Sequence, residues 1–255
     1  MNVKYDINGK IAIITINRPE RRNAVDQSTA TDLYNAFLEF DNDNSLSVAI
    51  LTGKGDHFCA GADLSDLSND TPNTVNKDGL MAPMGPSRLR LSKPVIAAVE
   101  GYAVAGGLEL ALWADLRVAS RSSIFGVFCR RFGVPLIDLG TIRLPRLIGQ
   151  SRATDMILTG REVNAQEAFE FGLVNRLVED GKALESAFEL ANQIAVFPQT
   201  CLRNDRLSML EQWDLSEQDA IANEITKGLK TITSGETQSG ANDFKNGKGR
   251  HGSFK

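Results

Sequence analysis

The sequence is poor in the residues that build metal sites and disulfide frameworks. Its 255 residues include two histidines, His57 and His251, and three cysteines, Cys59, Cys129 and Cys201. No two cysteines have the CxxC spacing, so the sequence argues against a zinc site and we expect no bound metal. An odd and sparse set of cysteines is typical of a reducing compartment, which predicts a cytoplasmic protein.

Three further absences narrow the class of protein. No apolar run approaches the length of a membrane-spanning helix, and the opening residues MNVKYDING lack a signal-peptide pattern. The formal net charge is -4 without a broad basic excess, which argues against binding to nucleic acid. No GxGxxG motif occurs in an early strand–turn–helix unit, so a Rossmann dehydrogenase fits poorly. The composition that remains, 42% hydrophobic and 24% charged, supplies the core of a globular domain.

Residues 95 to 115 carry the strongest functional signal. Val95–Val99 is a short β-branched, apolar run that predicts a buried strand. The helix predicted at Leu108–Trp113 follows a pair of glycines that starts at Gly106. Glycine lets another molecule approach the backbone closely, and the first N–H groups of a helix have no partner within it. The bend therefore predicts a site for a negatively charged oxygen, with Glu109 on the same face as an acid or base.

A second bend of small residues follows the strand predicted at Ser47–Thr52. Gly61 and Ala62 form a small-residue turn, and Asp63 can cap the segment that follows. Two such bends, each after a parallel strand, would present N–H groups to one oxygen from two sides. A purely structural interpretation also stands, in which Glu109 complements the helix dipole and the glycines permit close packing.

The N-terminal part of the sequence predicts a parallel α/β unit. Val3–Asn8 and Ile11–Ile16 alternate around a turn that contains Asn-Gly, which predicts a hairpin. A helix capped by Asp26 or Ser28 runs to about residue 40, and Ser47–Thr52 follows as a buried strand. Strand, helix and strand in this order imply a right-handed parallel crossover.

Short strands and helices continue to residue 195. We predict strands at 115–119, 124–126 and 173–178, and helices at 87–91, 142–149, 153–159, 165–171 and 183–195. The last of these helices has an apolar face made of Leu184, Ala187, Phe188, Ala191 and Ile194. Residues 69–86 lack periodicity and are either a lid over a site or a disordered excursion.

The last quarter of the chain predicts helices without strands between them. We expect helices at 200–213 and 216–234, and the second carries an apolar stripe of Ile221, Ile225, Leu229 and Ile232. Such a stripe must pack on the core of the same chain or on another subunit, and we favour the second interpretation. The sequence thus predicts a core of residues 1–195 and a helical oligomerisation region of residues 196–255.

Three arginines, Arg18, Arg21 and Arg22, cluster in the loop after the second strand. They are either a solvated basic loop or an anchor for the phosphate groups of a ligand. The residues alone do not separate these two interpretations.

Five stretches in order give the sequence a resemblance to the crotonase superfamily of enoyl-CoA hydratases and isomerases. They are NRPERRNAV (17–25), LTGKGDHFCAGADL (51–64), KPVIAAVEGYAVAGGLELALWAD (93–115), RLPRLIG (143–149) and ILTGREVNAQEAFEFGLVN (157–175). The resemblance covers nearly the whole chain, and it depends on the ordered set rather than on any single motif.

The resemblance implies an α/β fold, a crotonase-like spiral of ββα repeats with a helical C-terminal trimerisation region. It implies an acyl-CoA thioester as substrate, no separate cofactor, and a homotrimer or a dimer of trimers. In such enzymes two backbone N–H groups hold the thioester oxygen as it becomes an enolate. By position these donors are Ala62 and Gly106, and the first catalytic glutamate is Glu109. The residues expected to contact coenzyme A are Arg22, Ala24, Ala60, Ala62, Asp63, Leu64 and Gly106, with Arg22 as the phosphate partner.

The sequence departs from the hydratases at one position. They carry a second glutamate where this chain has Cys129, and a thiol is a poor substitute unless its pKa is strongly lowered. Asp138 lies near the place where isomerases and dehalogenases of the family have an acid, so we expect it to be catalytic. The leading hypothesis is an enoyl-CoA hydratase or isomerase. The alternatives are thioester hydrolysis, decarboxylation or dehalogenation using Asp138, or a non-catalytic acyl-CoA binder.

Overall fold

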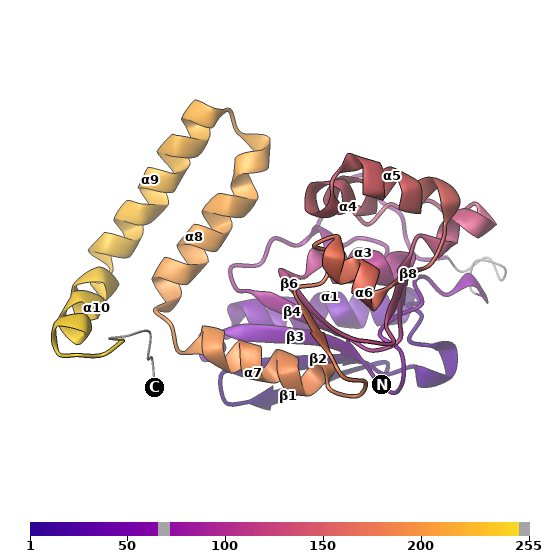
Figure 1. The fold of residues 1–255 in the computed structure, drawn as a ribbon, viewed down its shortest axis with the longest axis horizontal. Helices are drawn as coiled ribbons and strands as arrows, with labels where there is room; N and C mark the ends of the chain where they lie inside the picture. Colours follow the sequence, from indigo (N-terminus) through magenta and orange to yellow (C-terminus); the bar gives the residue numbers. More distant parts are fainter. Residues whose placement is uncertain (66–71, 250–255) are drawn as a thin grey trace. The chain divides into compact units, whose positions relative to one another are not determined.

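The structure is a computed structural model that describes residues 1–65 and 72–249. The chain separates into two compact units, Met1–Ala195 and Val196–Lys255, which we name the core unit and the C-terminal unit (Figure 1). None of the helices in the described ranges is long and apolar enough to cross a membrane.

A six-stranded sheet forms the centre of the core unit. Its strand order is β1-β2-β3-β4-β6-β9, with an antiparallel β1–β2 hairpin and parallel pairing from β2 onwards. The strands are β1 (Val3–Asn8), β2 (Ile11–Ile16), β3 (Val48–Gly53), β4 (Val95–Val99), β6 (Leu116–Ser120) and β9 (Arg176–Val178). The predicted hairpin is therefore confirmed.

The predicted parallel crossover is also confirmed. Helix α1 (Gln27–Asn42) connects β2 to β3, and Asp26 caps its first turn by accepting a hydrogen bond from the backbone N–H of Thr29 at 2.7 Å. Asp26, rather than Ser28, is thus the cap. The buried face of α1 includes Phe37 and Phe40, which belong to the larger of the two apolar clusters in the core unit.

A second, three-stranded sheet includes the strand that leads into the bend at Gly106. It consists of β5 (Tyr102–Val104), β7 (Ile124–Gly126) and β8 (Val163–Asn164). The sequence analysis predicted β7 but neither β5 nor β8, because three and two residues give no readable periodicity. The parallel pairing of β5 with β7 aligns Val104, at the start of the bend, with Gly126.

Both faces of the six-stranded sheet are covered, as parallel sheets require. Alternate residues of β4 belong to different apolar clusters: Ile96 and Ala98 pack with α7 (Ala183–Ala195), whereas Val95, Ala97 and Val99 face the cluster that contains α1. Figure 1 shows α7 lying along the sheet.

The predicted apolar face of α7 was wrong at Leu184, which is exposed. The residues that pack against the sheet are Ala183, Ala187, Leu190, Ala191 and Ala195. The small alanines let the helix axis come close to the strands, so the buried face is not the one with the largest side chains.

The remaining helical segments of the core unit are mostly short. The 3-10 turns are Pro19–Arg21, Pro86–Arg88 and Phe128–Phe132, and the α-helices are α3 (Gly106–Trp113), α4 (Gly140–Ile148), α5 (Gln150–Thr159) and α6 (Ala165–Glu170). The helix predicted at 87–91 is the single 3-10 turn at Pro86–Arg88.

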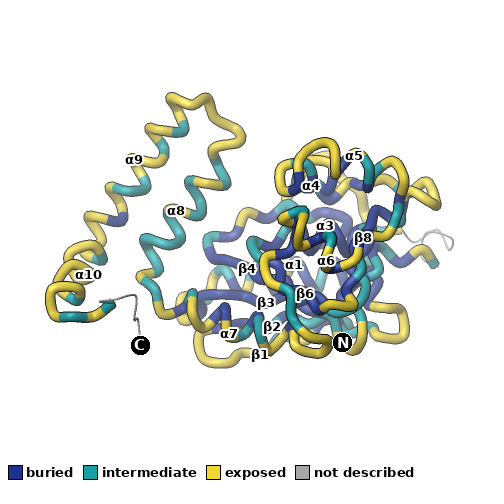
Figure 2. The backbone as a smooth tube through the Cα atoms, in the orientation of Figure 1, coloured by how far each residue is buried: buried dark blue, intermediate teal, exposed yellow. Residues whose placement is uncertain are grey.

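The C-terminal unit contains helices joined by short turns, and no strand occurs among its described residues. It contains α8 (Gln199–Glu211), a 3-10 turn (Gln212–Asp214), α9 (Glu217–Thr233) and α10 (Glu236–Lys245). Ser216 caps α9 as predicted, accepting from the backbone N–H of Asp219. The four predicted stripe residues of α9, Ile221, Ile225, Leu229 and Ile232, are each more than half exposed. Figure 2 shows the contrast with the buried strands of the core unit.

Candidate active site

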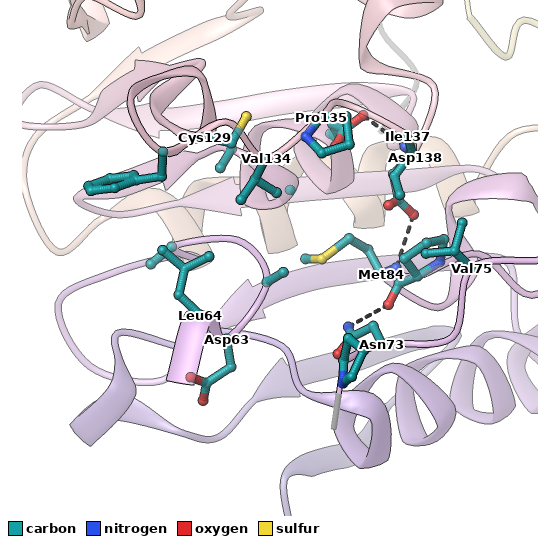
Figure 3. Close-up of a pocket in the computed structure, with 18 of the residues that line it drawn as sticks. Asp63, Leu64, Asn73, Val75, Met84, Cys129, Val134, Pro135, Ile137 and Asp138 are labelled. Carbon is teal, nitrogen blue, oxygen red and sulfur yellow. Dashed lines mark hydrogen bonds between the residues drawn. The ribbon is translucent and has the colours of Figure 1, made fainter. Parts of the chain in front are cut away.

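A cavity of about 260 Å³ in the core unit collects most of the residues that the sequence analysis selected. Its lining includes Ala60, Ala62, Asp63, Leu64, Gly106, Glu109, Cys129 and Asp138. Arg22 and Ala24 are not among the lining residues. The two bends, the predicted acids and the cysteine therefore meet at one place. Figure 3 labels Leu64, Cys129 and Asp138 among these lining residues.

The two small-residue bends are packed directly against each other. Gly61 has a φ of +100°, and a Cβ built on it would lie 3.0 Å from the backbone nitrogen of Gly106 and 2.9 Å from the Cβ of Ala105. Any side chain at position 61 would push these bends apart, in addition to straining the backbone. Glycine at this position is what allows the amides of Ala62 and Gly106 to be neighbours.

The bend before α3 has an unusual backbone conformation. Ala105 has φ 53° and ψ −126°, which a residue with a Cβ rarely adopts, and it occupies the N-cap position of α3. Its N–H donates to the carbonyl oxygen of Gly126 at 2.9 Å, which holds the bend to β7. Strained positions of this kind cluster at functional sites, where the surrounding structure maintains them.

The N–H groups of Ala62 and Gly106 donate to no group within residues 1–65 and 72–249. The backbone on either side of Ala62 is fixed, because the N–H of Asp63 donates to Val25 and the carbonyl oxygen of Gly61 accepts from Val25. The N–H of Gly106 also lies at the positive end of α3. Together the two amides form a site suited to an oxygen that carries negative charge.

Glu109 lies in the first turn of α3 and is 2% exposed. Its Oε1 accepts hydrogen bonds from the backbone N–H groups of Asp138 at 2.9 Å and Gly140 at 2.8 Å. Burial and, to a lesser extent, the charge of Asp138 raise the pKa of Glu109 from 4.5 to about 7, against the lowering effect of the two backbone hydrogen bonds. Glu109 is therefore able to lose and regain a proton near neutral pH.

The N-terminus of α4 is shaped to hold Glu109. Leu139, the N-cap residue, has a left-handed conformation with φ 68°, and it lies between the two residues whose amides bind the carboxylate. A Cβ on Gly140 would lie 2.7 Å from Oε1 of Glu109, so only glycine fits there without displacing the carboxylate.

Asp138 is also 2% exposed and contacts the segment that precedes β4. Its Oδ1 accepts from the backbone N–H of Met84 at 3.0 Å and from the hydroxyl of Ser87 (Figure 3 shows the Met84 bond). Arg143 donates to the carbonyl oxygen of Ser87 at 2.8 Å. Burial raises the pKa of Asp138 above its ordinary value, against the opposing effect of the hydrogen bonds from Ser87 and Met84. The sequence analysis did not select Met84, Ser87 or Arg143, because these contacts join segments some fifty residues apart.

Cys129 is buried and lines the cavity near Glu109. Burial raises the pKa of the Cys129 thiol, and the charge of Glu109 raises it further. The thiol is therefore uncharged at neutral pH and unsuited to act as a base. A thiol could replace the second glutamate only if its pKa were strongly lowered. The pKa of Cys129 is raised instead, so Cys129 does not take over that role.

Two arginines of the loop at residues 18–25, Arg18 and Arg22, have different environments. Arg18 pairs with Asp26 at 2.9 Å and Asp63 at 3.0 Å, so it fixes the loop to α1 and to the bend. Arg22 is exposed, with its guanidinium 5.8 Å from the centre of the Tyr102 ring. Its carbonyl oxygen accepts from the N–H of Ala60 at 3.0 Å, which joins the loop to the rim of the cavity.

Residues 72–86 of the segment predicted to be a lid contribute five residues to the cavity: Pro72, Asn73, Val75, Pro83 and Met84. The side-chain amide of Asn73 donates to the carbonyl oxygens of Pro83 and Val25. Residues 69–71 of that prediction, like His251, lie outside the described residues. Among the described residues, no three His, Cys, Asp or Glu side chains are placed to hold a metal ion.

The chain is similar to known proteins over most of its length. The family profile described as Enoyl-CoA hydratase/isomerase matches residues 6–251. A protein of Mycobacterium tuberculosis named Enoyl-CoA hydratase EchA19 is 37% identical over 243 residues, which cover 92% of this chain and 90% of the relative. A Short-chain-enoyl-CoA hydratase of Clostridium acetobutylicum is 39% identical over 202 residues, covering 76% of this chain and 75% of the relative.

A solved structure extends the likeness to the fold. The crystal structure of an enoyl-CoA hydratase from Mycobacterium tuberculosis matches with a TM-score of 0.90 and 38% identity, covering 96% of each chain. The predicted crotonase-like α/β fold with C-terminal helices is thereby confirmed. The chain belongs to the enoyl-CoA hydratase/isomerase, or crotonase, family.

Proposed function

We propose that this protein is an acyl-CoA enzyme that adds water to the double bond of a 2-enoyl thioester, with Glu109 as its acid and base. The observation that carries the proposal is the position of Glu109, buried beside two unpaired amides with its pKa raised to about 7. Names of relatives such as Enoyl-CoA hydratase EchA19 support the same reaction class.

The proposed mechanism uses the two amides for the oxygen of the thioester. The N–H groups of Ala62 and Gly106 bind this oxygen, and they bind it more strongly as it becomes the oxygen of an enolate. One donor of this kind contributes roughly 10²–10³ in rate. Because both amides are set by packed bends rather than by side chains, they require no rearrangement during the reaction.

Glu109 moves the protons in this proposal. As a carboxylate it takes a proton from water while the water oxygen bonds to Cβ, and the electron pair of the double bond moves into the enolate. As a carboxylic acid it then returns that proton to Cα, so that one water has been added in total. A single carboxylate suffices for both steps, which is consistent with an uncharged Cys129.

A second candidate function is the shift of a double bond in a 3-enoyl thioester. The observation that favours it is the close pair of buried carboxyl groups, Glu109 and Asp138, without a second glutamate. In this reaction one group removes a proton from one carbon, and the same or the other group returns a proton two carbons away. No water is consumed, so the two reactions are distinguished by their products.

The test is a kinetic comparison on 2-enoyl-CoA and 3-enoyl-CoA substrates, with Glu109→Gln, Asp138→Asn and Cys129→Ala variants. We expect hydration in the native protein, its loss in Glu109→Gln and its retention in Cys129→Ala. Activity on 3-enoyl-CoA alone, lost in Asp138→Asn, would favour the second candidate. Full activity of Glu109→Gln on a substrate that the native protein turns over would contradict both.

The same experiment covers the other reactions of the fold. A covalent adduct on Asp138, found by mass spectrometry, would favour dehalogenation, and release of free coenzyme A or carbon dioxide would indicate thioester hydrolysis or decarboxylation. Binding of acyl-CoA without turnover of any substrate would identify a non-catalytic binder.

We also propose contacts with coenzyme A and an oligomeric state. Ala60 and Leu64 line the cavity, and Arg22, whose carbonyl oxygen accepts from the N–H of Ala60, is the exposed cation proposed to bind a phosphate. Ala24 is buried and its carbonyl oxygen accepts from Arg18, and its contact with coenzyme A stays a prediction. The exposed stripe of α9 supports a homotrimer or a dimer of trimers.

A further inference from the structure

The mouth of the active-site cavity carries a band of exposed apolar side chains. Four residues that line the cavity are also substantially exposed: Leu64 (43%), Val75 (61%), Phe132 (69%) and Ile137 (37%). They come from four separate segments, namely the bend after Ala62, the chain after residue 72, the 3-10 turn Phe128–Phe132 and the turn before Asp138. We name these four residues the mouth band.

Such a band requires an explanation. Single exposed apolar residues are normal on a protein surface, but several gathered around one opening mark a surface that a ligand or partner covers. Here the band is continuous with a cavity whose floor holds Glu109 and the two amides. This continuity argues that the covering group is part of the same ligand that reaches the floor.

The cavity is small compared with an acyl thioester. Its volume of about 260 Å³ lies below the roughly 300–1,000 Å³ that is usual for small-molecule sites. The thioester, the adjoining end of the coenzyme and the reacting carbons must share this space if the oxygen lies at the two amides. A long acyl chain would therefore extend to the mouth.

The polar side chains of the lining are already occupied. The carboxylate of Asp63 pairs with Arg18 and accepts from Ser65, and Figure 3 shows it turned away from the cavity. The side-chain amide of Asn73 donates to two carbonyl oxygens. Within the described residues the upper lining thus offers a hydrocarbon surface and no charged group to bind a carboxylate at the end of an acyl chain.

We propose that the preferred substrate carries a long, purely hydrocarbon acyl chain, whose distal part covers the mouth band. This inference rests on the proposed acyl-CoA function and specifies its substrate class. Short acyl groups would bind at the floor but leave the mouth band exposed to water, so they would lose the contribution of its apolar contacts.

The test measures kcat/KM for straight-chain 2-enoyl-CoA substrates of four, eight and twelve carbons. We expect the twelve-carbon substrate to exceed the four-carbon one by about tenfold or more, because each buried methylene adds to binding in the transition state. A twelve-carbon substrate with a terminal carboxylate should be used poorly, since nothing in the upper lining would pair with its charge.

Two variants test the mouth band itself. Phe132→Ser should lower kcat/KM for the twelve-carbon substrate by roughly tenfold and lower the four-carbon value much less. Leu158→Ser, which replaces an equally exposed apolar residue on α5 outside the cavity lining, is the matched control and should change neither value. Val75→Ser provides a second mouth-band variant in a different segment, should Phe132→Ser fail to fold.

Three outcomes would overturn the inference. Equal or better use of the four-carbon substrate would contradict a long-chain preference, and so would equal losses on short and long substrates in Phe132→Ser. A change of oligomeric state in Phe132→Ser without a change of chain-length preference would identify the band as a protein interface. If no acyl-CoA of any length is turned over, the proposed acyl-CoA function itself fails. If acyl-CoA substrates are turned over without a preference for long chains, only the chain-length inference fails.

Discussion

The core unit and the C-terminal unit differ in whether their apolar and charged side chains are buried or exposed. The core unit buries large apolar residues on both faces of its sheet and also buries charged ones, including Lys93, Glu109 and Arg117. In residues 196–249 only Thr231 is buried, and the isoleucines of α9 are exposed. The core unit thus forms a complete interior that can hold ionisable groups in place. The C-terminal unit instead leaves the apolar stripe of α9 exposed, and we propose that another subunit covers it.

The buried charges of the core unit illustrate this difference. Arg117 donates to the carbonyl oxygens of Leu173, Ala111, Ala114 and Asp115, at distances between 2.6 and 3.1 Å. Burial lowers the pKa of Arg117 to about 10, so it remains charged at neutral pH. Its hydrogen bonds join α3, β6 and the segment before β9, which together support the bend and Glu109.

The largest expected effect concerns Glu109, a buried ionisable group of the core unit, and it is a loss of activity. Glu109→Gln removes the acid and base but can still accept the two backbone hydrogen bonds, so we expect activity to fall by about 10²–10⁴ without loss of folding. The measurement is kcat on the best 2-enoyl-CoA substrate. Glu185→Gln, an exposed surface carboxylate, is the control and should keep full activity.

The next largest effect is expected for the buried guanidinium. Arg117→Met would leave several buried carbonyl oxygens without donors, and we expect the free energy of unfolding to fall by about 3–5 kcal/mol in urea titrations. Arg121→Met removes an exposed arginine that pairs with Glu179 and should cost less than about 1 kcal/mol. Similar losses in both variants would show that the core unit does not depend on its buried charge.

A pH effect of intermediate size follows from Glu109. Because its pKa is raised by burial from 4.5 to about 7, the folded protein retains a proton that the unfolded chain loses between these pH values. This contribution makes the free energy of unfolding fall as pH rises through that range. Glu109→Gln lacks it, so the variant should gain up to about 3 kcal/mol relative to the native protein between pH 4.5 and 8. Parallel pH profiles of the two proteins would contradict a raised pKa.

The smallest expected effect concerns the C-terminal unit. Ile225→Asp places a charge in the exposed stripe of α9 and should weaken self-association by about 2 kcal/mol per interface or more, which sedimentation would detect as smaller species. Leu158→Asp on the core unit is the control and should leave the assembly unchanged. An unchanged mass for Ile225→Asp would remove the proposed role of the stripe.

The sequence predicted the parts of the fold that have local signals. The hairpin, α1 with its cap and the glycine bends were readable because turn residues, caps and apolar periodicity lie within a few positions of each other. Strands β5 and β8 were missed because they depend on pairing with β7 rather than on their own composition. Helix α10 was missed because Gly240 and several polar residues give it no apolar stripe.

The candidate site likewise has parts that local sequence signals predicted and parts that they did not. Gly106 and Glu109 lie within one turn of one helix, so their proximity could be predicted from spacing alone. The hydrogen bonds from Asp138 and Gly140 to Glu109, and from Ser87 to Asp138, join distant segments and leave no local signal. Arg18 was grouped with Arg22 as a candidate phosphate anchor, but only the structure assigns its side chain to Asp26 and Asp63.

The most direct test is a crystal structure of the protein with an unreactive acyl-CoA thioester. We predict that the thioester oxygen lies 2.7–3.1 Å from the backbone nitrogens of both Ala62 and Gly106, with the carboxyl group of Glu109 next to the carbon beside the carbonyl. A thioester oxygen bound to neither amide, or a Glu109 carboxyl that faces away from the bound chain, would contradict the account.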